Sequence, residues 1–352
     1  MVVFALTVAM TVAVAGTTLG YDFAAYHAAA DRVLHGKPLY DMAYQEAGPY
    51  GLFIYPPTFL PLVLVFGLVP LAPATWLWIA GLVAVFLGGV AALPVRRGTR
   101  WAILLLAGLS WPFLYALKLG QVGPILFALF ALGWRWLDRG PALGATGALG
   151  AAIKIQPGLV LAWALLTRRW TAVLTGSLVL VVLAVVATLL AGAGSWADFL
   201  TLMGRINDPI TTPHNFTPGA VLYQAGVPRD VAAVVQWVST AVVARLFVWA
   251  ALRLPAVPSY LVAVIASQLV SPVLWDHYAV ILLLPVAWLL DRGHWWAALV
   301  ILATPVFLVG LVPAWVYPLA FWACLASVIW VGHATGTGRS AAASGATAPA
   351  GG

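Results

Sequence analysis

Residues 172–194 read AVLTGSLVLVVLAVVATLLAGAG, a run without a single charged side chain. A helix needs roughly 20 consecutive apolar residues to cross the hydrocarbon core of a bilayer. The strands of an outer-membrane barrel would alternate polar and apolar residues, and this run does not alternate. The stretch therefore predicts a transmembrane α-helix.

The rest of the chain has the same character. Of its 352 residues, 63% are hydrophobic and only 8% are charged, whereas soluble domains carry about 25% charged residues. A second long apolar run, TWLWIAGLVAVFLGGVAALP, begins at Thr75. A soluble globular protein of this size could not bury so many apolar residues, because its surface must be covered with polar groups. The predicted fold class is all-α, polytopic and membrane-embedded.

Apolar segments follow one another along the whole chain and predict about 11 to 13 membrane segments. They lie at 2–19, 57–70, 73–93, 101–117, 121–137, 141–153, 157–167, 170–192, 230–252, 258–270, 278–290, 294–312 and 314–331. The shortest of them are typical of re-entrant or interfacial segments. No cleavable signal is evident, and 2–19 is expected to be an uncleaved first span. Residues 1–331 form one membrane domain, and the Gly/Ala/Ser-rich tail 332–352 is expected to be disordered.

Three polar stretches interrupt this pattern, at 20–56, 195–230 and 271–277, and hold most of the acidic residues. The basic residues cluster in other interhelical turns, at Arg96, Arg97, Arg100, Arg135, Arg139, Arg168 and Arg169. Such clusters follow the positive-inside rule, so the net charge of +7 does not indicate nucleic acid. The three polar stretches are then extracytoplasmic, provided that segment 57–70 does not span.

Asp22 begins the first polar stretch, just outside the first apolar segment. It is followed by FAAYHAAADRVLHG, an amphipathic helical pattern that ends at Gly36, and it shares a helix face with Tyr26. One interpretation is a helix N-cap, where Asp is common. The other is a catalytic carboxylate at the membrane surface.

Asp276 and His277 lie between two apolar runs in the third stretch, SPVLWDH. Ionisable groups at membrane depth cost on the order of 2.5–3.5 kcal/mol each and are usually functional. The alternative is an interfacial pair that ends a helix, since the neighbours Trp275 and Tyr278 are ordinary interface residues.

Two lysines and a loop motif complete the polar candidates. Lys118 in LKLGQVGP and Lys154 in AAIKIQPG could each bind a phosphate oxygen or extend to a lipid headgroup, and the second interpretation is favoured for Lys154. HNFTPG at 214–219 offers polar donors, and its Asn215-Phe216-Thr217 also fits the weak glycosylation pattern. The single cysteine, Cys324, excludes a disulfide within the chain. Phosphate-loop, zinc-protease, nucleophile-elbow and dinucleotide motifs are all missing.

Taken together, these motifs resemble glycosyltransferase family 87, whose members have the C-type (GT-C) membrane fold. The resemblance begins with YDFAAYHAAADRVLHGKPLYD and FIYPPTFLPL. It continues in order through LGQVGPILFALFAL, AAIKIQPGLVLAWALLTRRW and SPVLWDHYAVILLLP, over roughly residues 20 to 290.

The resemblance implies transfer of mannose from a polyprenyl-phosphate mannose to a glycolipid or glycan acceptor, with α-(1→2) linkage as the expectation. Asp22 corresponds to the family's first-loop catalytic aspartate, and His277 to a second active-site residue. Further substrate- or phosphate-binding candidates are Tyr26, Lys118, Gln121, Arg205, His214, Asn215 and Asp276.

The expected mechanism uses Asp22 as a single base, with inversion at the anomeric carbon. The leaving phosphate needs no general acid and is met by His277, Lys118 and Arg205. No cofactor or obligatory metal is expected, and the protein is expected in the plasma membrane with its site on the extracytoplasmic face. Transfer of arabinose or glucose from a lipid carrier stays open, as does a different class of function, a transporter or lipid flippase.

Overall fold

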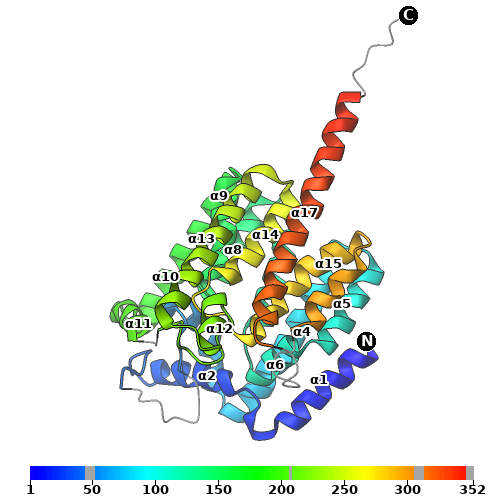
Figure 1. The fold of residues 1–352 in the computed structure, drawn as a ribbon. Coiled ribbons are helices and arrows are strands. Elements are labelled where there is room, and N and C mark those ends of the chain that lie inside the picture. The colour runs from blue at the N-terminus through cyan, green and yellow to red at the C-terminus, as the bar shows by residue number, and fades with distance from the viewer. Residues whose placement is uncertain (44–51, 206–207, 305–312, 346–352) are drawn as a thin grey trace, which may run out of the picture.

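A computed structural model describes residues 1–43, 52–205, 208–304 and 313–345, and in these residues every regular element is helical (Figure 1). The α-helices are α1 Val2–Ala15, α2 Tyr21–Leu34, α3 Leu60–Val63, α4 Leu71–Ala92, α5 Arg97–Leu109, α6 Trp111–Leu119, α7 Gly123–Arg135, α8 Gly140–Ile153, α9 Leu159–Leu166, α10 Trp170–Ala191, α11 Gly194–Arg205, α12 Pro218–Gln224, α13 Arg229–Arg253, α14 Ala256–Leu269, α15 Leu283–Asp291, α16 Ala298–Leu302 and α17 Val316–Gly345. The short 3₁₀ segments are η1 Gly16–Thr18, η2 Pro57–Phe59, η3 Leu64–Leu68, η4 Gln156–Gly158, η5 Asp276–Leu282 and η6 Trp295–Ala297.

The predicted class, an all-α polytopic membrane protein, is confirmed, but few of the helices have full spanning length. In the described residues four helices are long and apolar enough to cross a bilayer, namely α4, α10, α13 and Val316–Ala334 of α17. Two bent pairs, α1 with α2 and α5 with α6, raise this number to six, and five further apolar helices are shorter. The expectation of about 11 to 13 segments counted each apolar run as one, and proline and glycine break several runs into short helices.

The break between α5 and α6 shows how the sequence shortens a helix. Pro112 cannot continue α5, because it lacks an N–H group and its ring clashes with the preceding turn. The side chain of Ser110 instead accepts a hydrogen bond from the backbone N–H of Phe113 and starts α6. The two helices meet at an angle of 66°. The segment expected not to span, 57–70, forms a short helix over Pro57–Leu68 that is divided by 3₁₀ turns.

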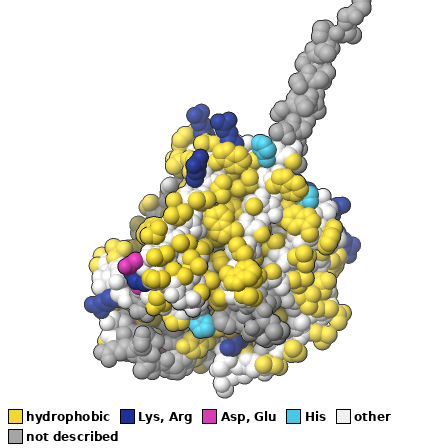
Figure 2. Space-filling model, viewed as in Figure 1, with side chains coloured by type: hydrophobic (Ala, Val, Ile, Leu, Met, Phe, Trp, Pro, Cys, Tyr) yellow, Lys and Arg dark blue, Asp and Glu magenta, His cyan; other side chains and the backbone are white. Residues whose placement is uncertain are grey.

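The core lies around α14, η5 and α15. From Pro258 to Leu289 most side chains are buried, and the buried set includes Tyr260 and Trp288. On the outside, α10 leaves a row of large side chains exposed, including Leu174, Leu178 and Leu189. Figure 2 shows hydrophobic side chains over most of one face of the molecule. An exposed apolar surface of this kind is the one that a bilayer would cover.

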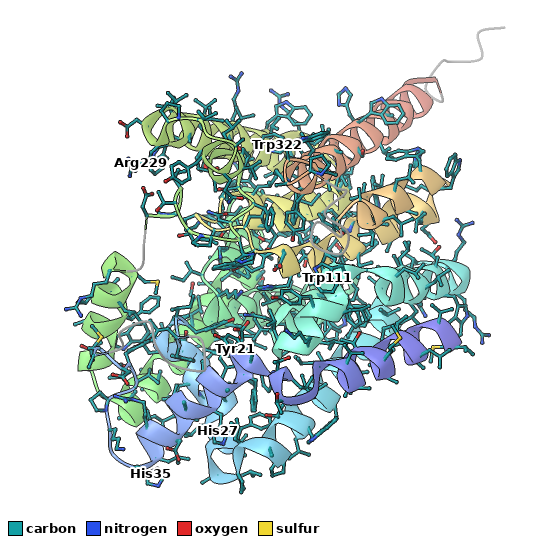
Figure 3. The ribbon with its side chains drawn as sticks, turned by 60° about the horizontal axis from the view of Figure 1, so that its bottom comes forward. Tyr21, His27, His35, Trp111, Arg229 and Trp322 are labelled. Carbon is teal, nitrogen blue, oxygen red and sulfur yellow. The ribbon has the colours of Figure 1, made fainter. Side chains whose placement is uncertain are left out.

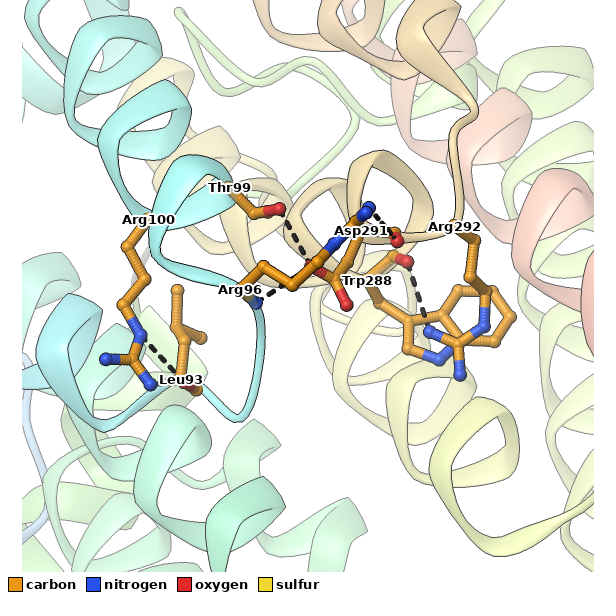
Figure 4. Close-up of polar contacts among 7 residues, drawn as sticks. All are labelled: Leu93, Arg96, Thr99, Arg100, Trp288, Asp291 and Arg292. Carbon is orange, nitrogen blue, oxygen red and sulfur yellow. Dashed lines mark hydrogen bonds and ion pairs between the residues drawn. The ribbon is translucent and has the colours of Figure 1, made fainter.

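The predicted basic clusters share one end of the bundle. Arg96 bonds to Asp291 through its backbone N–H at 2.9 Å and its guanidinium at 3.1 Å, which joins the α4–α5 turn to the end of α15 (Figure 4). Arg135 donates to the carbonyl of Ala92 at 3.5 Å. Arg169 donates to the carbonyl of Leu137, joining the α9–α10 turn to the α7–α8 turn. The helices α2, α11 and α12 of the polar stretches lie at the other end (Figure 1).

The C-terminal segment differs from the expectation. Disorder was expected from Gly332, but α17 continues to Gly345, and only 346–352 lie outside the described residues. The extension of an existing helix needs no new nucleus, and each added residue gains one backbone hydrogen bond. Cys324 of this helix is buried.

Candidate active site

Asp22 is the second residue of α2 and is half-buried. The N-cap interpretation is wrong, because the cap residue is Gly20 and no side chain makes a capping bond there. The backbone N–H of Gly20 donates to the carbonyl of Lys118 at 2.7 Å and ties the start of α2 to the end of α6. The carboxylate therefore lies in the first helical turn, where the helix dipole favours negative charge, and is available for other partners.

The Asp22 carboxylate accepts a hydrogen bond from Gln121, whose Nε2 donates to Oδ2 of Asp22 at 2.5 Å. The hydroxyl of Tyr55 donates to Oε1 of Gln121 at 2.9 Å, and the hydroxyls of Tyr26 and Tyr55 lie 2.6 Å apart. Since Tyr55 gives its only hydroxyl hydrogen to Gln121, Tyr26 must be the donor to Tyr55. The result is a directed chain of hydrogen bonds that ends on the Asp22 carboxylate.

Gly120 places Gln121 in this chain. It ends α6 in the left-handed region with φ 73°, and the N–H groups of Gly120 and Gln121 donate to the carbonyls of Leu117 and Ala116. This is the Schellman pattern, which requires a residue that tolerates positive φ. A Cβ atom at position 120 would also lie 2.8 Å from Cβ of Phe23. A glycine is thus needed for both the turn and the close contact with α2.

Lys154 points into the same region. Helix α8 ends at Ile153, because the ring of Pro157 would clash with the Ile153 carbonyl in a continued helix. The extended backbone of Lys154 brings Nζ to 3.1 Å from the hydroxyl of Tyr278 and to 5.4 Å from the ring centre of Tyr55. The favoured expectation, that Lys154 extends to a lipid headgroup, is therefore wrong. Its charge acts instead on the Asp22 carboxylate.

Asp276 and His277 open η5 and are both buried, with 5% and 4% of their surface exposed. This excludes the interpretation of the pair as an interfacial helix end. His277 Nδ1 lies 3.3 Å from Oδ1 of Asp276, but neither ring nitrogen of His277 has a hydrogen bond within the described residues.

The hydroxyl of Tyr317, on α17, holds the turn that carries His277. It donates to the carbonyls of Trp275 and Asp276, at 2.7 and 2.6 Å, and accepts the N–H of Ala279 at 3.0 Å. The C-terminal helix therefore positions an active-site candidate, although no motif in the sequence singled Tyr317 out.

Asn215 fixes the other end of this turn from the second polar stretch. Its Nδ2 donates to the carbonyls of Pro209 and Pro272, and its Oδ1 accepts the N–H groups of Thr217 and Leu274. The side chain is fully buried with its hydrogen-bonding capacity used. The structure thus gives Asn215 a structural role in place of the predicted substrate contact, and leaves it inaccessible as a glycosylation acceptor.

The remaining predicted residues lie farther out. Lys118 is half-buried with Nζ 5.5 Å from the ring centre of Tyr115. Arg205 and His214 are exposed, and Arg205 donates to the carbonyl of Met42 at 3.4 Å. Among the described residues neither Lys118 nor Arg205 contacts Asp22 or His277, so these two lie outside the central cluster.

Figure 3 locates the helices α2 and α6, whose ends meet at the cluster. Figure 3 shows Tyr21 at the start of α2 and Trp111 at the start of α6 in the middle of the view, whereas His35 and Arg229 lie at its edges. Trp111 stacks on Tyr115 with ring centres 5.0 Å apart. The described residues contain no group of three His, Cys, Asp or Glu side chains placed to hold a metal ion.

Sequence reasoning did not name Tyr55 or Tyr278 as site residues, and it favoured the lipid-headgroup interpretation of Lys154 over phosphate binding. Each had a signal, because each lies inside a motif that carries the family resemblance, namely FIYPP, IKIQPG and WDHY. Their mutual contacts could not be predicted, since Lys154 and Tyr278 are 124 positions apart.

Comparison with known proteins gives two matches. A sequence model described as glycosyltransferase family 87 matches residues 53–272, more than half of the chain. A relative from Mycolicibacterium smegmatis (strain ATCC 700084 / mc(2)155), the polyprenol-phosphate-mannose-dependent alpha-(1-2)-phosphatidylinositol pentamannoside mannosyltransferase, is 28% identical over 324 residues. That alignment covers 81% of this chain and 75% of the relative. No solved structure matches the chain significantly.

Proposed function

Because the chain belongs to glycosyltransferase family 87, we propose that it transfers mannose from a polyprenyl-phosphate mannose to a hydroxyl of a glycolipid or glycan, forming an α-(1→2) linkage. The protein is a glycosyltransferase and a multi-pass membrane protein, and the transporter or flippase alternative is set aside. The named activity of the M. smegmatis relative supports mannose and a polyprenyl phosphate as the donor parts.

One observation carries the proposal: Gln121 joins the Asp22 carboxylate to the Tyr55 hydroxyl by hydrogen bonds, and the Lys154 ammonium lies 5.4 Å from the ring centre of the same Tyr55. Glycosyl transfer from a lipid phosphate needs a base for the acceptor hydroxyl and positive charge for the departing phosphate. The cluster offers both kinds of group at one place.

In the proposed reaction the acceptor oxygen attacks the anomeric carbon while Asp22 takes its proton. The bond between that carbon and the phosphate oxygen breaks, and the electron pair leaves with the polyprenyl phosphate. A phosphate monoester has a second pKa of about 6, so it departs as an anion and needs no proton. Direct displacement inverts the anomeric carbon, and a β-linked donor gives an α-linked product.

The residues around Asp22 take supporting roles. Gln121 holds the carboxylate, and Tyr26 and Tyr55 hold Gln121. His277 is a candidate for contact with the phosphate, and its partner Asp276 orients the ring. Lys118, Arg205 and His214 are candidates for contacts with the substrates farther from the reacting atoms.

The proposed site faces the extracytoplasmic side of the plasma membrane. The support is the separation of charge: the basic clusters of the α4–α5, α7–α8 and α9–α10 turns lie at one end of the bundle, and the polar stretches lie at the other. Clusters of Arg and Lys are retained on the cytoplasmic side.

The test is transfer by the purified full-length protein in lipid nanodiscs. Polyprenyl-phosphate mannose, arabinose and glucose are offered in parallel, with phosphatidylinositol mannosides as acceptors, and products are identified by mass spectrometry and linkage analysis. We expect one added mannose that α-mannosidase removes. Transfer from the arabinose or glucose donor alone, or a β-linked product, would overturn the proposal.

A further inference from the structure

The Lys154 ammonium has unused hydrogen-bonding capacity inside the protein. It has three N–H donors, and one reaches the Tyr278 hydroxyl at 3.1 Å. Its charge lies 4.3 Å from the ring centre of Tyr278 and 5.4 Å from that of Tyr55. Within the described residues no carboxylate comes within ion-pair distance of Nζ, although the charge of Asp22 acts on it from farther away. Two donors are thus left over.

Two neighbouring groups are short of partners in the same way. The Tyr278 hydroxyl accepts from Lys154, so its own hydrogen is free to donate. His277, the preceding residue, has 4% of its surface exposed. Its Nδ1 faces Oδ1 of Asp276 at 3.3 Å, whereas its Nε2 is buried without a hydrogen bond in the described part of the chain. A buried polar atom without a partner destabilises the folded protein, and a ligand that supplies the missing hydrogen bond recovers that free energy.

We propose that Lys154, Tyr278 and His277 form an anion cradle that binds the phosphate of the polyprenyl carrier. This inference rests on the proposed function and makes Lys154, in place of Lys118 or Arg205, the main cationic ligand of that phosphate. The three groups come from two chain segments that meet only in the fold. The Lys154 ammonium and the Tyr278 hydroxyl each have a hydrogen free for a phosphate oxygen, and Nε2 of His277 offers a third when the ring is protonated. Charge-assisted bonds of this kind are about twice as strong as neutral ones.

The cradle gains strength as the reaction proceeds. In the donor the phosphate is a diester with one negative charge, and bond breaking moves an electron pair onto its oxygen and brings its charge toward two. The fixed ammonium therefore stabilises the leaving group more than the bound donor, which is the differential stabilisation that speeds a reaction. It follows that the product, a polyprenyl phosphate, binds the protein on its own and inhibits it.

Binding of decaprenyl phosphate to the full-length protein in detergent tests this inference without any sugar transfer. Thermal stabilisation is titrated for the wild type, Lys154→Met, Tyr278→Phe and Lys118→Met. The matched control is Lys37→Met, whose side chain is exposed in the first polar stretch. Decaprenol, which lacks the phosphate, and excess inorganic phosphate as a competitor separate binding of the lipid chain from binding of the headgroup.

We expect Lys154→Met to weaken decaprenyl phosphate binding by about 10- to 100-fold and Tyr278→Phe by about 2- to 10-fold. Lys37→Met should bind like the wild type, and inorganic phosphate should compete in the wild type but not in Lys154→Met. Wild-type affinity in Lys154→Met, a larger loss in Lys118→Met, or equal binding of decaprenol by the wild type would overturn the cradle.

The failure of this inference can be told from failure of the proposed function. Asp22→Asn removes the base but leaves the cradle, so it should lose transfer and keep decaprenyl phosphate binding. If Lys154→Met binds decaprenyl phosphate normally while the wild type still transfers mannose, the cradle is wrong and the function stands. If the wild type transfers no mannose but Lys154→Met loses binding, the cradle stands and the function is wrong.

Discussion

The side-chain amide of Gln121 donates a 2.5 Å hydrogen bond to the carboxylate of Asp22, across 99 positions of sequence. This contact joins the end of α6 to the start of α2. Within the described residues the other carboxylate oxygen of Asp22 has no hydrogen-bond partner. Separate predictions follow for the base Asp22, for Gln121, which holds it, and for Gly120, whose turn places Gln121.

Replacing Asp22 with asparagine should lower the rate of mannose transfer by about 10²- to 10⁴-fold, the usual contribution of a positioned base. The change keeps the size of the side chain but removes its ability to accept a proton. The measurement is initial transfer rate in nanodiscs, with the thermal unfolding midpoint as a check of folding. A folded Asp22→Asn protein with the wild-type rate would exclude Asp22 as the base.

Gln121→Met should lower kcat by about tenfold or more and change KM for the donor little. The methionine fills the same space but donates no hydrogen bond, and a bond to a charged group is worth about 1.5–3 kcal/mol. Gln121→Glu should be worse, because an ionised carboxylate beside Asp22 repels it. Steady-state kinetics separates the two parameters. An effect on KM alone would show that Gln121 contacts substrate and does not position the base.

Gly120→Ala should destabilise the protein more than Gly36→Ala. Both glycines have positive φ, at 73° and 69°, so each alanine costs about 1–2 kcal/mol of backbone strain. Only at position 120 does the new Cβ also meet a neighbour, Phe23, at 2.8 Å, whereas no atom lies within 4 Å at position 36. Thermal unfolding measures the difference. Equal losses in the two variants would mean that α2 is not held by this contact.

Tyr317→Phe should lower both stability, by about 1–3 kcal/mol, and transfer activity. It leaves the buried N–H of Ala279 without a partner and frees the turn that carries His277. Tyr260→Phe is the matched control. It also removes a hydrogen bond from a buried tyrosine hydroxyl, to the Phe130 carbonyl at 2.8 Å, but this bond does not hold the turn that carries His277. The control should lose stability only. Full activity in folded Tyr317→Phe would contradict a positioning role.

Asp291→Asn should make the stability of the fold less sensitive to acidification than it is in the wild type. Burial raises the pKa of Asp291, but hydrogen bonds from the backbone N–H of Arg96, from Thr99 and from the Arg96 guanidinium outweigh it and hold the pKa below its ordinary 3.8. The unfolded chain therefore binds more protons as pH falls below that value. The stabilisation by Asp291 is complete above the ordinary value and is lost as pH falls through the folded pKa.

Unfolding midpoints of the detergent-solubilised protein between neutral pH and about pH 3 measure this effect. The wild type should lose stability on acidification more steeply than Asp291→Asn. Asp138→Asn, whose side chain is fully exposed, serves as the control and should follow the wild type. Parallel curves for the wild type and Asp291→Asn would contradict the prediction.

Two particular outcomes show how far local pattern reaches. The helix predicted after Asp22 ends at Leu34, just before Gly36, because amphipathic spacing and a positive-φ glycine are local features. The N-cap interpretation of Asp22 was wrong by two residues, because α2 begins at Tyr21 with Gly20 as its cap, at a bend of 58° between α1 and α2. That bend depends on packing against α4 and α6, which no local pattern records.

The sequence by itself determined the membrane-embedded, all-helical class and the separation of basic turns from polar stretches. Both follow from the preference of each side chain for lipid or for water, which does not depend on its tertiary contacts. Only the tertiary structure decided that Lys154 turns inward, that Gln121 bonds to Asp22 and that the Asn215 side chain bonds to the backbone around it. These outcomes depend on which helices pack together, and packing is settled by the shapes and hydrogen-bonding needs of residues distant in the chain.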